Sequence, residues 1–168
     1  RDLLTSDPGV DLVHFTILRE PSKLDNTPQD ELSLIAFPFR ELFEIKLHDF
    51  DLIIFDRYRL NDVVPDRYFA NIARFVEKGG ALLAASGPDD ATKRSIVYTS
   101  LEPVLPSTPS GLVYEGPFRP AVSEAGMHHP VTRDLSALQA SWGHWLRQVD
   151  IAPQQGTDIL MNGAEGKP

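Results

Sequence analysis

Residues 50–56, Phe50-Asp51-Leu52-Ile53-Ile54-Phe55-Asp56, form a short apolar run bounded by acidic residues. A run of this length and composition predicts a strand that is buried on both faces, as in a parallel sheet. Residues 81–86, Ala81-Leu82-Leu83-Ala84-Ala85-Ser86, form a second such run before Gly87-Pro88. We therefore expect two neighbouring strands of one sheet.

The segment between these runs predicts a helix over residues 65–78. Pro65 suits a first helical turn, and Gly79-Gly80 suits the end of a helix. The apolar side chains recur at spacings of three and four, as on one helical face, at Tyr68, Ile72, Phe75 and Val76. A strand, a helix and a strand in this order predict a βαβ unit with parallel strands.

The flanking segments carry weaker patterns. Residues 11–18 predict a strand, residues 32–37 a second short strand, and residues 39–47 a helix. After residue 88 the chain is rich in proline, and its apolar clusters suit either edge strands or packed loops, at residues 96–98, 112–114 and 121–122. Residues 145–151 alternate as a half-exposed strand does. The expected class is α/β, a flavodoxin-like parallel sheet flanked by helices, with irregular proline-rich additions after residue 88.

The composition of the chain excludes several classes of protein and of functional site. The chain has 168 residues, 42% of them hydrophobic, which suits a single domain over residues 1–168. The net charge of -8 argues against a nucleic-acid binder, which needs a basic face. The absence of cysteine excludes disulfides, thiolate metal ligands and a cysteine nucleophile. No apolar run reaches 18 residues, so no membrane contact by this domain is expected. The terminal segments predict a fragment of a longer chain.

Several phrases together resemble the class I glutamine amidotransferase-like domains found in large bacterial membrane proteins. Beside the βαβ core, the phrases that carry the likeness are Phe37-Pro38-x-Arg40-Glu41-Leu42-Phe43, Asp49 to Arg57, His129-Pro130-Val131-Thr132-Arg133-Asp134-Leu135 and Trp142-Gly143-x-Trp145. The His-Pro-Val-Thr phrase is also similar to trehalose-utilisation-like relatives. The resemblance implies a flavodoxin-like fold and a soluble domain of a membrane-anchored protein, on the periplasmic side.

The catalytic residues of that family are not matched. The resemblance places the family's cysteine nucleophile at the turn after the second strand, where this chain has Ser86. Pro88 removes an amide donor there, and Asp89 and Asp90 add negative charge where an oxyanion would form. His129-Pro130 is similar to the family's His-Pro-Glu phrase, but Val131 replaces the glutamate. We therefore expect no glutaminase activity, and Ser86 and His129 are the only candidates for catalysis.

A ligand site is expected at the carboxyl ends of the two strands, where doubly wound proteins bind ligands. The candidate residues are Asp56, Arg57, Ser86, Gly87 and Asp89, with Asp90 beside them. Arg57 suits a bidentate contact with a ligand's carboxylate. Equally, Asp56 could form an ion pair with Arg57 or with Arg40. No cofactor and no metal are expected, because His128 and His129 are neighbours without a ligand spacing.

Three functions follow from these residues. The first is a non-catalytic module that binds other domains of its parent protein, or a small ligand, through the strand ends. The second is a hydrolase of a carbohydrate or amide that uses Ser86 and His129. The third is a structural spacer, which predicts no pocket at the strand ends and an apolar patch elsewhere. Trp142 and Trp145 suit core packing, or stacking on a sugar or a partner chain.

Overall fold

A computed structural model describes residues 2–15, 37–60 and 64–168 of the chain. Contacts divide the chain into two compact units, Arg1–Pro38 and Phe39–Pro168. The first unit contains α1 (Asp2–Thr5) and a turn in which the Asp7 carboxylate accepts the Gly9 N–H at 2.8 Å. The prediction that residues 1–168 form a single domain stays a prediction.

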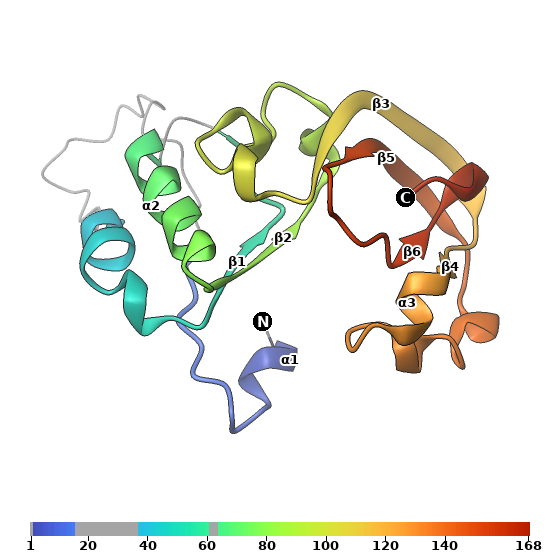
Figure 1. The fold of residues 1–168 in the computed structure, drawn as a ribbon, viewed down its shortest axis with the longest axis horizontal. Helices are drawn as coiled ribbons and strands as arrows, with labels where there is room; N and C mark the ends of the chain where they lie inside the picture. The colour runs from blue at the N-terminus through green and yellow to red at the C-terminus, as the bar shows by residue number, and fades with distance from the viewer. Residues whose placement is uncertain (1, 16–36, 61–63) are drawn as a thin grey trace, which may run out of the picture. The chain divides into compact units, whose positions relative to one another are not determined.

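The predicted βαβ unit is confirmed in the second unit. Strands β1 (Leu52–Asp56) and β2 (Ala81–Ala85) pair in parallel, with Leu52 opposite Ala81 and Asp56 opposite Ala85. Helix α2 (Asp66–Glu77) joins the two strands and lies beside them (Figure 1). The described part of the chain is therefore mixed α/β, and it contains this parallel pair and two antiparallel ones.

Helix α2 ends where the glycines predict. Gly79 has a φ of 101°, a left-handed conformation that favours glycine, and its N–H donates to the carbonyl of Val76. A side chain on Gly80 would lie 2.3 Å from the ring of Phe75, so only glycine, which has no side chain, fits where the chain leaves the helix. These two glycines turn the chain directly into β2.

The core surrounds one face of α2. Phe69 and Ile72 are fully buried, and Tyr68 is nearly so. Leu101 is also fully buried, in a segment of short helices after β2 that packs against α2. Two residues of the predicted helical stripe, Tyr68 and Ile72, therefore lie in the hydrophobic core, whereas Phe75 and Val76 are half-buried. Burial of this core stabilises the unit by removing apolar area from water.

The prediction that both strands are buried on both faces is wrong. Ile53 is buried, but Leu52 is 46% exposed and Leu83 is 50% exposed. Parallel sheets normally carry helices on both faces, whereas α2 can cover only one. Within the described residues the other face of the pair is open and apolar.

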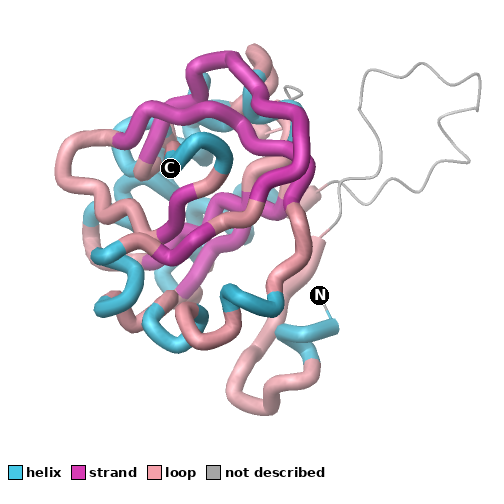
Figure 2. The backbone as a smooth tube through the Cα atoms, turned by 90° about the vertical axis from the view of Figure 1, so that its right-hand side faces the viewer, coloured by secondary structure: helices cyan, strands magenta, loops and turns pink. Residues whose placement is uncertain are grey.

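The additions after residue 88 are more regular than expected. Strand β3 (Ser107–Phe118) pairs with β5 (Trp145–Pro153) in an antiparallel ribbon (Figure 2). The proline-rich composition is compatible with a strand because the register shifts between Pro109 and Val113, and again before Phe118. Of the three apolar clusters, 112–114 lies in β3, 121–122 forms a strand, and 96–98 forms a short helix in which Ile96 and Val97 are buried and Tyr98 is exposed.

The remaining elements are short. β4 (Ala121–Val122) pairs with β6 (Met161–Asn162), and α3 (Glu124–His128) lies beside them (Figure 1). The single-turn helices are η2 (Glu41–Ile45), η3 (Leu47–Asp49), η4 (Pro88–Ala91), η5 (Ile96–Tyr98), η6 (Glu102–Val104), η7 (Arg133–Leu135), η8 (Gln139–Ser141) and η9 (Ala164–Gly166). Helical structure at 39–47 is thus confirmed, as a π-helical turn followed by a 3-10 turn.

Two expectations concern the first unit. Residues 11–15 form no strand, so the strand predicted for 11–18 is wrong over its described part, and residues 16–18 lie outside the described residues. Residues 32–36 of the second predicted strand also lie outside them. Across the described part of the chain, no helix combines the length and apolar character needed to span a membrane.

Candidate functional site

The strand ends bring four of the candidate residues together. Asp56 lies opposite Ala85 at the last register position of the parallel pair. The N–H of the next residue, Arg57, donates to the carbonyl of Ala85 at 2.8 Å, so Arg57 continues the ladder beside Ser86. Gly87 is the next residue after Ser86. We call these four residues, together with Asp89 two positions further along the chain, the strand-tip cluster.

Arg57 has an unusual backbone conformation. Its φ of 47° lies in the left-handed region, which glycine adopts freely and other residues adopt at a cost. A methyl group on Gly87 would lie 3.2 Å from both Cβ and Cγ of Arg57. Gly87 therefore leaves room for the stem of the Arg57 side chain.

The charges at the strand tips pair locally. Nε of Arg57 lies 3.5 Å from Oδ1 of Asp56, and both side chains are more than 70% exposed. Asp89 lies 4.0 Å from Nη1 of Arg59. The expected pairing of Asp56 with Arg57 is therefore present, whereas Arg40 pairs with Glu44 at 3.6 Å. Exposed pairs of this kind add little stability.

The segment after β2 is used for packing. Asp90 accepts a hydrogen bond from the Ser95 hydroxyl at 2.5 Å, which ties η4 to the following turn. η4 also contacts the β3–β5 ribbon, and a side chain on Gly111 would come 3.9 Å from the carbonyl oxygen of Ala91. The segment that follows β2 therefore packs against the ribbon.

Ser86 and His129 do not form a catalytic pair. Ser86 is exposed, and within the described residues its hydroxyl makes no hydrogen bond. Nδ1 of His129 accepts the N–H of Val131 at 3.2 Å. His129 follows α3, which lies with β4 and β6 rather than at the end of β2 (Figure 1). His129 is therefore not placed to act as the base that Ser86 would need.

Two shallow hollows lie on the second unit, and neither is lined by the strand-tip cluster. One, of about 370 Å³, is lined by Leu135, Trp142, Gly143, Trp145 and Met161. Trp145 is 52% exposed, so core packing of this residue, one of the two roles expected for it, is wrong. Trp142 is half-buried.

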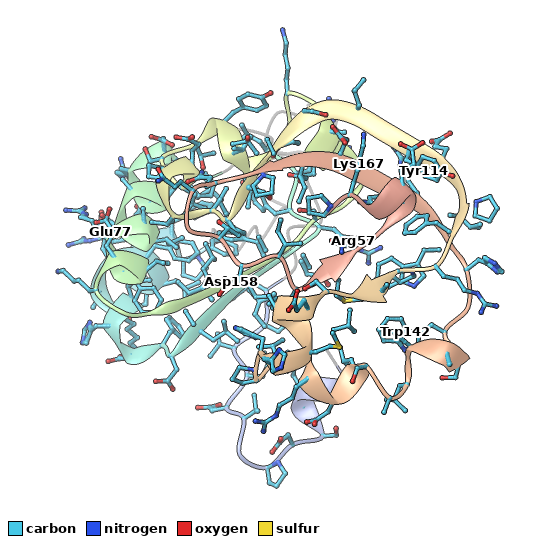
Figure 3. The ribbon with its side chains drawn as sticks, turned by 45° about the vertical axis from the view of Figure 1, so that its right-hand side comes forward. Arg57, Glu77, Tyr114, Trp142, Asp158 and Lys167 are labelled. Carbon is cyan, nitrogen blue, oxygen red and sulfur yellow. The ribbon has the colours of Figure 1, made fainter. Side chains whose placement is uncertain are left out.

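The other hollow, of about 240 Å³, lies between the ribbon and the C-terminal turn, at residues that the sequence did not single out. Asp150 accepts hydrogen bonds from Ser110 at 2.6 Å and from Nζ of Lys167 at 3.0 Å. The Ser110 hydrogen bond, followed by that of Lys167, lowers the pKa of Asp150, and Asp150 raises the pKa of Lys167. Tyr114 and Lys167 lie near each other in Figure 3.

The polar side chains of this hollow hold the C-terminal turn against the ribbon. Gln148 accepts the N–H of Ala164 at 2.6 Å and donates to the carbonyl of Pro168 at 2.7 Å, so it holds the C-terminal turn. The alternation along β5 places Gln148 and Asp150 on one face, which is the only sequence signal for this contact. Every hydrogen-bonding atom of the Asp150 carboxylate is already used.

The described residues contain no group of three or more histidine, aspartate or glutamate side chains that could hold a metal ion. Comparisons with protein-family models, with curated proteins and with solved structures each gave no match to this chain.

Proposed function

We propose that this chain is a non-catalytic, amidotransferase-like binding module of a larger membrane-anchored protein. It contacts another domain of that protein, or a small ligand, through the strand-tip cluster. The proposal includes a flavodoxin-like sheet, of which β1 and β2 are two strands, and an extracytoplasmic position.

One observation carries this proposal. The chain has a parallel strand pair of the kind whose ends form ligand sites in doubly wound proteins, and Ser86, which the resemblance places at the family's nucleophile, makes no hydrogen bond to a base within the described residues. The scaffold of a site is therefore present without the groups that would make it react. The hydrolase alternative would need His129 or another base beside Ser86, and the geometry gives it no support.

Activity is tested first. The chain is expected to hydrolyse glutamine no faster than the background, and Ser86→Ala is expected to change nothing. Turnover that disappears in Ser86→Ala would contradict the proposal.

Binding is tested in the full-length parent protein. A photo-crosslinking amino acid at position 56 is expected to link the strand-tip cluster to another domain or to a bound molecule. The matched control is position 134, where the Asp134 side chain is 91% exposed and far along the chain from the cluster. The same products from both positions would show that the strand tips are not a specific contact surface.

A further inference from the structure

Arg57 combines a strained backbone with unused hydrogen-bond donors. A left-handed conformation is strained for a residue with a side chain, and glycine at the same place would avoid this strain. The Arg57 N–H is fixed to the Ala85 carbonyl at 2.8 Å, so the sheet itself holds the strained conformation. Strain of this kind persists only where the surrounding structure enforces it, and it clusters at functional sites.

The stem of the Arg57 side chain is also fixed. A side chain on Gly87 would press on its Cβ and Cγ at 3.2 Å, so a glycine at position 87 is what allows Arg57 to sit there. The chain therefore has an arginine where a glycine would be less strained, and a glycine where a larger residue would displace that arginine. Both choices favour one placement of the guanidinium group.

Arg57 and Ser86 each carry hydrogen-bond donors without a partner within the described residues. Only Nε of Arg57 faces Asp56, at 3.5 Å, and within the described residues neither terminal nitrogen has a partner. The Ser86 hydroxyl is likewise without a hydrogen bond there, and Ser86 follows the residue that accepts the Arg57 N–H. A planar fork and a hydroxyl in adjacent positions suit an acceptor with two oxygens.

We infer that the strand-tip cluster binds a carboxylate group, held by the guanidinium of Arg57 and the hydroxyl of Ser86. This inference rests on the proposed function and gives Ser86 a donor's role in place of a nucleophile's. A carboxylate is favoured over a phosphate because Asp56, 3.5 Å from Nε of Arg57, repels a doubly charged group more strongly. Asp56 is a competitor that the ligand's carboxylate replaces on Arg57.

The test uses the whole 168-residue chain and sodium acetate as the probe. Nuclear magnetic resonance follows the Nε–Hε group of Arg57 and the amide of Ser86 at constant ionic strength, held with sodium chloride. Saturable shifts are expected, with a Kd on the order of 10 mM, which suits one small ion on a surface site. Sodium phosphate is expected to bind more weakly than acetate.

Variants locate the site. Arg57→Lys keeps the charge but loses the fork, and is expected to weaken acetate binding about tenfold. Ser86→Ala is expected to weaken it about threefold, and Asp56→Asn to strengthen it about threefold. Arg133→Lys is the matched control, because Arg133 is also exposed beside an adjacent aspartate, with 3.9 Å between Nε and Asp134, but has no left-handed backbone. It is expected to change nothing.

Three results would overturn the inference. They are shifts that rise linearly with acetate, an unchanged Kd in Arg57→Lys, and saturation at the Arg133 Nε–Hε group with the same Kd. Tighter binding of phosphate than of acetate would overturn the choice of carboxylate. These results do not depend on the crosslinking experiment, so a strand-tip contact with a partner domain can persist when acetate binding fails.

Discussion

The contact between Arg57 and Gly87 offers a sharp test of the strand-tip geometry. Gly87→Ala adds a methyl group 3.2 Å from Cβ and Cγ of Arg57. Gly87 has a φ of -112° and a ψ of -174°, which alanine adopts without strain, so the contact alone opposes this change. Cβ of Arg57 cannot rotate away, because the adjacent N–H is bound to Ala85.

The magnitudes can be worked out from these contacts. Alanine in place of glycine in an allowed conformation stabilises a protein by roughly 0.4–1 kcal/mol, because the unfolded chain has fewer conformations. Relief of the close contact by a distorted side chain costs roughly 0.5–1.5 kcal/mol. Gly87→Ala is therefore expected to lower the free energy of unfolding by about 0.5 kcal/mol. Arg57→Gly removes the left-handed strain of the arginine, and is expected to raise stability by about 0.5 kcal/mol.

The double variant, Arg57→Gly with Gly87→Ala, tests whether the two residues are in contact. With glycine at position 57, Gly87→Ala meets no stem and is expected to stabilise, so the two changes should be coupled by about 1 kcal/mol. Urea denaturation followed by circular dichroism, with all four proteins at one pH, measures this coupling. Additivity within about 0.3 kcal/mol would show that the two residues do not touch, and would refute the reasoning.

Three further outcomes are expected. The pKa of Asp66 is lowered from 3.8 by hydrogen bonds from the hydroxyl and then the N–H of Ser100, so Asp66→Asn should lower the free energy of unfolding at pH 7. The difference between the two proteins should vanish as the pH falls through the folded-state pKa of Asp66. A difference that persists at pH 2 in thermal unfolding would contradict this. Gly126→Ala should destabilise by about 2 kcal/mol in urea, because the new methyl group would lie 2.1 Å from the carbonyl oxygen of Leu160, whereas Gly143→Ala, which meets nothing within 4 Å, is the control. Leu101→Ala should cost about 3 kcal/mol by the same measurement, since Leu101 is fully buried; a cost below 1 kcal/mol would place it outside the core.

The sequence predicts best where the signal is local. The apolar runs, the helical spacing at Tyr68 and Ile72 and the two glycines each depend on near neighbours, and the βαβ unit that they predict is present. The strand ends follow from this topology, so the meeting of Arg57 with Ser86 and Gly87 was also predictable. Proline content misled the prediction after residue 88, because a strand in a two-stranded ribbon tolerates proline where the register shifts.

Other features depend on contacts between distant residues. The exposure of Leu83 depends on how many helices cover the sheet, and the exposure of Trp145 depends on how β5 packs. The left-handed φ of Arg57 has no sequence signal, since asparagine or glycine would be the expected residue there. The separation of His129 from the strand ends follows from the pairing of β4 with β6, residues about 40 positions apart.

The sequence by itself determined the parallel strand pair, its connecting helix and the absence of a cysteine nucleophile, because these properties reside in residue identity and local spacing. Only the tertiary structure decided that His129 does not reach Ser86, that one sheet face is open within the described residues, and that Arg57 is strained beside Gly87. Each of these depends on the meeting of segments that are remote in the chain, and such meetings depend on the packing of the whole unit.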